Sequence, residues 1–245
     1  MTTRALTETL RSGVLALGAG LVGFADLLVL DRPPFGRELS RAVSIAVPLD
    51  REVVRRVSRG PDALYAREYD RANGELERIA RACAMVLSGM GYRALAMEPT
   101  CTPPEGSADT TPLPHKTVAT LAGLGWIGRC ALLVTPGFGS ALRLCSVLTD
   151  APLDAGEPWT DSACGDCYEC AERCPGGAVR GEAWRQGVSR ERLYDHAACR
   201  RTAEELSREA GLGSMAICGI CMSVCPFTRA YADGGPSPGG DLALH

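Results

Sequence analysis

Eight of the twelve cysteines in this sequence lie between residues 164 and 225. The stretch CGDCYECAERCP has the spacing C-x2-C-x2-C-x3-C-P, the bacterial ferredoxin pattern for a [4Fe-4S] cluster. Its two-residue spacers let a loop wrap three thiolates around one face of a cubane. Structural zinc is the competing interpretation, but zinc usually takes ligands from two separated pairs and has no use for a third closely spaced cysteine. The stretch therefore predicts an iron–sulfur cluster.

A second, incomplete run follows in CGICMSVCPF, where Met215 occupies the position of the missing first cysteine. In two-cluster ferredoxins the fourth cysteine of each run ligates the other cluster, so the seven motif cysteines leave one ligand short of eight. Cys199 is the one remaining cysteine in this half of the chain. We therefore predict two clusters, the first held by Cys164, Cys167, Cys170 and Cys225 and the second by Cys174, Cys199, Cys218 and Cys221.

The alternative for the second cluster is a free Cys199 and a ligand that is either not cysteine or comes from the N-terminal half. In either case, interleaved runs hold two clusters close together and form a path for single low-potential electrons. A path of this kind needs an acceptor. We expect the preceding 160 residues to hold it, because a ferredoxin alone needs far fewer residues than this chain has.

The elements that position this chemistry follow from periodicity and turn signals. A long helix is expected over 63–89, because its apolar residues recur at helical spacing. The Pro/Thr/Gly-rich stretch 98–113 is too long for a simple connector and is a candidate active-site wall. The remaining expectations are helices over 4–18 and 50–58, and strands over 20–30, 41–48, 92–97, 130–135 and 140–149.

The stretch GLGWIG at 123–128 fits the glycine fingerprint of a dinucleotide-binding turn, with Asp150 near the expected ribose-binding position. That fingerprint must follow an apolar strand and open a helix. Here it follows the helix-like HKTVATLA and precedes the strand-like ALLVTP, so the order is reversed. The sequence therefore predicts a glycine-rich turn from helix to strand.

Bulk composition excludes several classes of function. The net charge of −3 gives no general basic field for nucleic acid, so a nucleic-acid partner is not expected. The apolar stretch 12–30 is interrupted by four glycines and Asp26, which argues against a signal peptide or membrane span. We expect a cytoplasmic protein whose crowded cysteines bind metal in place of forming disulfides.

These motifs together resemble the epoxyqueuosine reductase family and its shorter double-cluster relatives, which are related to reductive dehalogenases. The resemblance covers about 109–228, from DTTPLPHKTVATLAGLGWIG to CGICMSVCPF. It implies an α+β fold with a nitroreductase-like α/β cobalamin-binding domain at 1–155, a ferredoxin-like two-cluster domain at 156–231 and a flexible tail at 232–245.

The resemblance also implies roles for single residues. Asp109 aligns with the family's proposed proton donor and is the candidate catalytic acid, although it could simply cap a Thr/Pro turn. A flat corrin ring suits bare backbone and an indole face, and Gly123, Gly125, Trp126 and Gly128 are implied to line its pocket.

Three departures separate this sequence from the family. It ends soon after the second cluster run, it is acidic, and His115 and Lys116 replace a Glu-Arg pair. These departures weaken the expectation of a tRNA substrate and leave the cofactor chemistry in place.

Several other residues are expected to have structural roles. Tyr65 and Tyr69 could offer a phenol proton near a cobalt site, but packing on the long helix is expected. His115 could contact substrate or cofactor, but a position in solvent at the start of a helix is expected. The remaining cysteines are interpreted as core or loop residues: Cys83, Cys101, Cys130 and Cys145.

Two functional hypotheses follow. In the first, both clusters pass electrons from a low-potential donor such as ferredoxin or flavodoxin to a cobalamin that reduces a small molecule. In the second, the chain is an electron-transfer protein or reductive activator for the corrinoid of a partner protein. A pocket that binds flavin or no cofactor is the third alternative.

Overall fold

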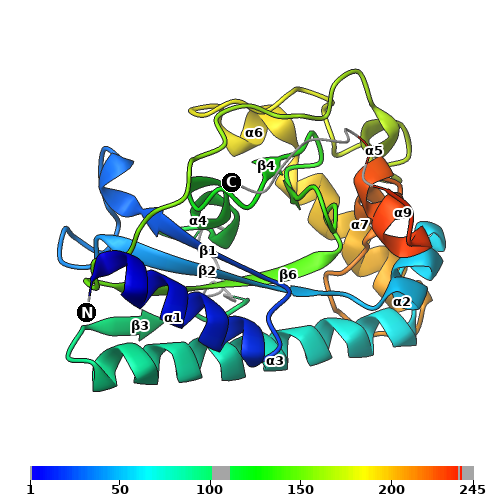
Figure 1. Cartoon of the computed structure of the whole chain (residues 1–245). Helices are drawn as coiled ribbons and strands as arrows, with labels where there is room; N and C mark the ends of the chain where they lie inside the picture. The colour runs from blue at the N-terminus through cyan, green and yellow to red at the C-terminus, as the bar shows by residue number, and fades with distance from the viewer. Residues whose placement is uncertain (1, 101–110, 237, 239–245) are drawn as a thin grey trace.

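The computed structural model describes residues 2–100, 111–236 and 238, and Figure 1 shows the arrangement of its elements. In chain order the helices are α1 (Thr3–Ala16), α2 (Arg51–Arg56), α3 (Ala63–Gly89), α4 (His115–Leu121), α5 (Glu169–Glu172), α6 (Arg190–Leu193), α7 (His196–Glu209), α8 (Ile220–Ser223) and α9 (Pro226–Asp233). The strands are β1 (Leu21–Asp26), β2 (Arg41–Pro48), β3 (Ala94–Ala96), β4 (Trp126–Ile127), β5 (Leu133–Val134) and β6 (Leu142–Thr149), and short 3₁₀ turns occupy Leu27–Val29 and Val57–Arg59.

A four-stranded antiparallel sheet forms the centre of the fold, in the order β1-β2-β6-β3. Val43 of β2 lies opposite Phe24 on one side and Val147 on the other. The six inner residues of β2 are all buried, because the strand is central and covered on both faces. The short β4 and β5 form a separate hairpin.

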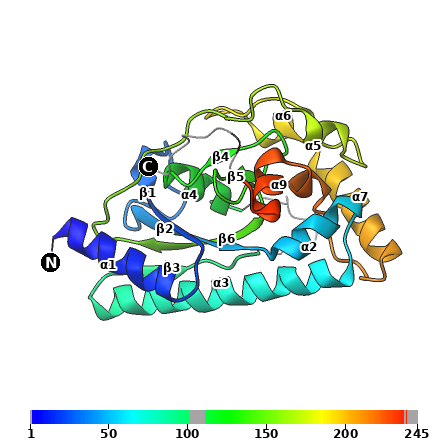
Figure 2. The same ribbon diagram turned by 45° about the vertical axis from the view of Figure 1, so that its right-hand side comes forward.

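Helices cover the two faces of this sheet unequally. Val43 and Ile45 belong to the larger core, which also contains buried residues of α1 and α3 such as Leu10 and Leu76. Ala46 belongs to the opposite core, which contains the buried face of α4. Figures 1 and 2 show α3 running along the whole sheet on one side, with α4 on the other.

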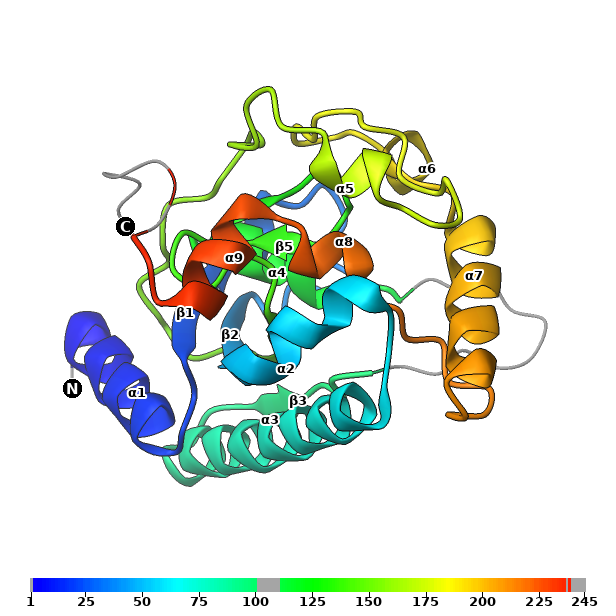
Figure 3. The same ribbon diagram turned by 90° about the vertical axis from the view of Figure 1, so that its right-hand side faces the viewer.

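The cysteine-rich half packs against the end of the sheet layer. Helix α9 contacts α2, and α8 contacts both α5 and the 3₁₀ turn after α2, as Figure 3 shows. Ile217 and Met222 join the larger core, beside buried residues of α3. The loops that carry the cysteines are therefore held by elements from the first 60 residues of the chain.

Most expected elements are confirmed. The strand at 41–48 and the helix at 63–89 have the predicted bounds. The expected strand at 92–97 is shorter, at Ala94–Ala96. GLGWIG follows a helix and lies outside any parallel β-α-β unit, which confirms that it is no dinucleotide fingerprint. Among the described residues, no helix is both long and apolar enough to cross a membrane.

Candidate functional site

Three cysteines of the first predicted set come together from two distant loops. Burial raises the pKa of the Cys225 thiol to about 11, and the nearby Cys164 and Cys170 add to the rise. Cys167 lies half-buried on the same loop as Cys164. The chain reverses after Cys164 at Gly165, which has a φ of +54° and so suits glycine.

Three cysteines of the second predicted set also converge. Cys199 lies in the first turn of α7, close enough to the Cys174 and Cys218 thiols to interact with them electrostatically. Burial is the main cause that raises the Cys199 pKa, and the two neighbouring thiols raise it further. The structure therefore brings Cys199 near Cys174 and Cys218 of the same predicted set.

The close approach of these loops depends on two glycines. A Cβ at Gly176 would lie 2.3 Å from Thr202 Oγ1 of α7, and a Cβ at Gly219 would lie 2.3 Å from Val57 Cγ1. Gly219 also has a φ of +79°, in the left-handed region. Both positions therefore lack room for a side chain.

The described cysteines are all free thiols. In the described ranges, no three His, Cys, Asp or Glu side chains gather closely enough to hold a single metal ion. A cubane has a different requirement, since it takes one thiolate at each of four separated corners.

GLGWIG forms a platform beneath the first cysteine loop. The Trp126 side chain is fully buried, packs against Trp159 and Phe227, and directs its indole Nε1 to Cys164 Sγ at 3.5 Å. A Cβ at Gly125 would lie 2.1 Å from the Val134 carbonyl oxygen. The glycine is needed for close contact between β4 and β5.

The other two glycines of this turn have related roles. Gly123 has a φ of +75° and ends α4. A Cβ at Gly128 would lie 2.8 Å from Val134 Cγ2 and 3.5 Å from both Cys130 Sγ and Cys164 Sγ.

The residues implied to line a corrin pocket all belong to this turn. None of Gly123, Gly125, Trp126 and Gly128 is among the described residues that line the cavity between the sheet layer and the cysteine-rich half. The physical reason is that backbone contacts and the indole are already used to pack the β4–β5 hairpin against the cysteine loop.

Sequence reasoning missed two residues directly after this turn. Arg129 is buried, donates to the carbonyl oxygens of Gly165 (2.7 Å) and Gly181, and stacks over Tyr168 with 4.3 Å between the guanidinium carbon and the ring centroid. It ties the platform to the cysteine loop. The charge of Arg129 next to a glycine-rich turn was the available signal.

Cys130 was expected to be an ordinary core residue. Its thiol instead lies beside the thiols of Cys170 of the first set and Cys221 of the second. It also packs in a small buried cluster with Cys170 and Val224. Cys130 is therefore a ninth thiol between the two predicted cluster sites.

A cavity of about 680 Å³ lies between the sheet layer and the cysteine-rich half. Its walls come from α3, α4, β6 and the loops that carry the second cysteine set. All four cysteines of that set line it, namely Cys174, Cys199, Cys218 and Cys221, whereas none of the first set is among the described lining residues. The cavity therefore includes the site of the second predicted cluster, and no cysteine of the first set belongs to its described walls.

Two basic residues of the cavity wall, His115 and Lys116, begin α4. His115 is half-buried, with its ring nitrogens 2.9 Å from Ser146 Oγ and 2.8 Å from the Glu98 carbonyl oxygen. The solvent-facing position expected for it is wrong, because the first turn of α4 points into the cavity. Burial lowers the pKa of His115 and lowers that of Lys116 to about 8.

Both tyrosines of α3 also reach the cavity. Burial raises the pKa of Tyr65, which keeps its phenol protonated. Tyr69 stacks under Arg143, with 4.1 Å between the guanidinium carbon and the ring centroid. Tyr65 and Tyr69 therefore pack in the core beside α3, as expected, and also face the cavity. Asp109 and Cys101 lie outside the described residues.

Comparison with known protein families identifies the cysteine-rich segment of the chain. Residues 163–228 match the family described as the 4Fe-4S double cluster binding domain. The chain therefore carries a domain for two [4Fe-4S] clusters, as the cysteine spacing predicted.

A curated relative confirms the resemblance stated from the sequence. The epoxyqueuosine reductase of Synechococcus sp. (strain CC9605) is 34% identical over 167 residues, which cover 67% of this chain and 48% of the relative. This chain spans about half the length of the curated relatives that it matches. The chain is therefore related to iron–sulfur oxidoreductases whose curated name, epoxyqueuosine reductase, is that of an enzyme.

Solved structures support the same fold. A reductive dehalogenase described in terms of B12-dependent dehalogenation superposes with a TM-score of 0.69 at 22% identity, covering 93% of this chain and 32% of that chain. An epoxyqueuosine reductase with a tRNA-Tyr epoxyqueuosine-modified stem loop gives 0.62 at 20% identity, covering 98% and 68%. Both show a shared mixed helix and strand fold.

Proposed function

We propose that this chain is an iron–sulfur reductase that passes electrons singly from the first cluster to the second and then into the large cavity. The main support for this proposal is that all four cysteines of the second set line the cavity, whereas none of the first set is among its described lining residues. This arrangement gives the path a direction. A low-potential donor such as ferredoxin or flavodoxin would supply the first cluster.

We further propose that the chain consists of two domains with separate functions. Residues 1–155 form a nitroreductase-like α/β domain that holds the cofactor and substrate, and residues 156–231 form a ferredoxin-like domain that holds the clusters. The tail expected from residue 232 begins two residues too early, because Ala232 and Asp233 belong to α9, so the proposed tail follows Asp233. The cavity at the junction of the first two parts, lined from both, supports this division.

Cobalamin is the proposed electron acceptor in this cavity. One cavity wall is apolar, from Leu133, Leu142 and Leu144, as is usual for cofactor sites. His115 is the only histidine among the described lining residues, and both ring nitrogens are already bonded within the protein. The wall therefore suits a corrinoid bound without a histidine ligand from the protein. When bound, a reduced corrinoid supplies low-potential electrons to an organic substrate.

The chain's own residues would bind the substrate and supply a proton. Lys116 and Arg143 present positive charge to the cavity, and neutral His115 holds the start of α4 against β6. Asp109 is the proposed acid, which would give its proton to the leaving group. In support, a structure of the Bacillus subtilis epoxyqueuosine reductase is described with a catalytic aspartate loop that swings out of the active site.

The alternative is an electron-transfer protein that reduces the corrinoid of a partner. The same cluster path would then end at the partner. The tRNA-bound relative also keeps a nucleic-acid substrate open for this fold, against the expectation from net charge. Substrate-dependent oxidation of the reduced clusters without any protein acceptor distinguishes the enzyme from the electron-transfer protein.

The experiment is anaerobic cluster reconstitution followed by addition of cob(II)alamin, observed by electron paramagnetic resonance. We expect a base-off cobalt signal beside two [4Fe-4S] signals. Leu132→Trp should remove the base-off signal, because this cavity-lining side chain is 37% exposed and can accept added bulk without damage to the core.

Leu95→Trp is the matched control, since Leu95 is 43% exposed on β3 and does not line the cavity. It should keep the base-off signal. A free-cobalamin spectrum in the unmodified protein, beside two intact clusters, would contradict the cobalamin proposal and favour the electron-transfer protein.

A further inference from the structure

Arg143 is a cation held in place by neutral groups. Its Nε donates to Asn73 Oδ1 at 3.0 Å, and one terminal nitrogen donates to Tyr69 Oη at 3.0 Å and Thr100 Oγ1 at 2.9 Å. Its guanidinium also lies over the Tyr69 ring. No carboxylate in the described part of the chain forms an ion pair with it. These contacts fix the guanidinium in one orientation at the cavity wall, and no carboxylate of the described residues balances its charge.

Lys116 is also a cation at the cavity wall that is held by neutral groups. Its Nζ donates to the Ala131 carbonyl oxygen at 2.7 Å and lies 5.9 Å from the Tyr194 ring centroid. Within the described ranges it has no carboxylate partner either. One acceptor satisfies a single N–H of an ammonium group that carries three.

The other charged groups of the cavity wall do not balance these two cations. Glu191 is the one acidic residue among the described lining residues, and its carboxylate lies 3.4 Å from Arg190 Nε. His115 is held neutral by burial. The Arg190–Glu191 pair cancels, so Arg143 and Lys116 leave the wall with an excess of positive charge.

The groups whose charges shift the pKa of Lys116 are Cys130 and Arg190, and none of the four cysteines of the second set is among them. Half-buried cations without a protein partner are unfavourable unless a ligand supplies the opposite charge. The missing counter-charge is therefore expected to come from the occupant of the cavity.

We propose that the cavity binds a small organic anion, with Arg143 and Lys116 holding its carboxylate or phosphate oxygens and the leucine wall holding its apolar part. A guanidinium fixed in orientation suits paired anionic oxygens, and a lysine adds a point charge. The inference names the substrate class for the proposed reductase. Binding itself requires neither cobalamin nor turnover, so the two proposals can fail separately.

The test is ligand-observed NMR on protein loaded with both clusters but without cobalamin. Two matched probe pairs are used: benzoate against benzamide, and phenyl phosphate against benzyl alcohol. At least one anion should bind more tightly than its neutral partner, and the pair that shows the difference identifies the anionic group. Arg143→Gln and Lys116→Gln should each lower the affinity for that anion by roughly tenfold or more. This is the usual contribution of a hydrogen bond to a charged group.

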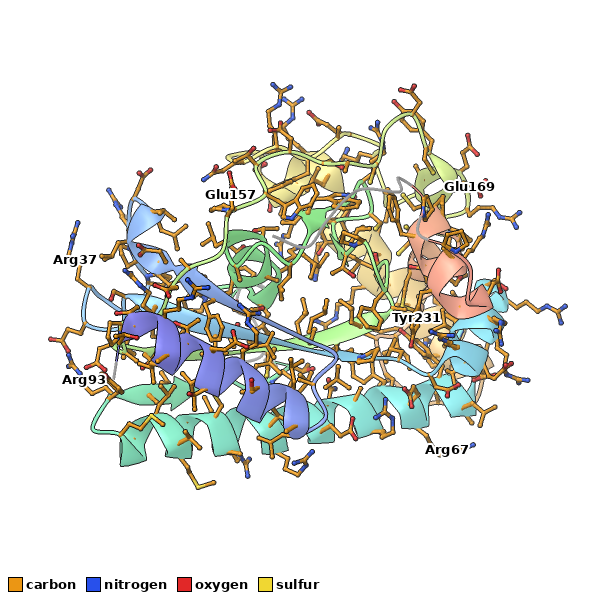
Figure 4. The ribbon with its side chains drawn as sticks, viewed as in Figure 1. Arg37, Arg67, Arg93, Glu157, Glu169 and Tyr231 are labelled. Carbon is orange, nitrogen blue, oxygen red and sulfur yellow. The ribbon has the colours of Figure 1, made fainter. Side chains whose placement is uncertain are left out.

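Arg93→Gln is the control, because Arg93 bonds Asp150 and Glu38 at the far end of the molecule from α5, as Figure 4 shows. It should leave anion affinity unchanged, and unchanged iron content in all three variants shows that each is folded. The proposal is overturned if neither anion binds more tightly than its neutral partner. It is equally overturned if both cavity variants, correctly folded, bind the anion as the unmodified protein does.

Discussion

The two predicted cluster sites have the same number of cysteines and opposite surroundings. The first is supported by Trp126 and Arg129 and lies away from the cavity, whereas all four cysteines of the second line it. Equal ligand chemistry can therefore serve unequal roles. In the proposed function, the protein around the first site tunes its potential, and the second site delivers electrons into the cavity.

The largest expected effect comes from the cysteine that completes the second site. Cys199→Ala should reduce the iron content from about eight to about four atoms per chain, because one of two four-iron clusters loses a ligand. Cys130→Ala should retain about eight, since eight other cysteines lie within the matched domain. Iron and sulfide analysis with electron paramagnetic resonance measures both. Full iron content in Cys199→Ala would restore the alternative of a free Cys199.

A stability test addresses the platform under the first site. Gly125→Ala should lower the free energy of unfolding by roughly 3 kcal/mol, because its Cβ would meet the Val134 carbonyl oxygen at 2.1 Å. Gly137→Ala is the matched control, with nothing within 4 Å of its Cβ. Thermal or denaturant unfolding of the reconstituted proteins gives the comparison. Equal stability of the two variants would show that β4 and β5 do not pack as described.

Anion binding in the cavity should depend on pH through Lys116. Lys116 has a pKa lowered by burial to about 8, so it carries its charge below that pH and loses it above. A bound anion raises this pKa. Affinity for the anion should therefore fall as pH rises through and above 8, and Lys116→Gln should lack this step. A pH series of the NMR titration measures it, and a flat profile in the unmodified protein would exclude Lys116 from binding.

The smallest expected effect concerns the potential of the first cluster. Trp126→Phe removes the N–H directed at Cys164 Sγ and keeps most of the ring packing. A hydrogen bond to a ligand sulfur stabilises the more negative reduced cluster, so its loss should lower the first reduction potential. The second potential should stay constant. Redox titration followed by electron paramagnetic resonance separates the two, and equal shifts of both would contradict the assignment.

Much of the local structure could be predicted because its signals are short-range. Helical spacing defined the helix at 63–89, and a buried apolar run defined the strand at 41–48. The cysteine runs gave the double-cluster domain for the same reason, since the ligand spacing is written in consecutive residues. GLGWIG was correctly excluded as a dinucleotide turn, but its actual partners were not foreseen, because Val134 and Cys164 reach it only through folding.

The sequence alone determined the kind of chemistry, since two runs of cysteines at cluster spacing admit few alternatives. Tertiary structure decided which residues surround that chemistry. Lys116 and Arg143 lie on separate elements, and no local pattern indicates that they share a cavity. Cys130 was likewise indistinguishable from a core cysteine until the loops packed around it. Ligand spacing is a property of neighbours along the chain, whereas charge balance and burial depend on contacts between distant segments.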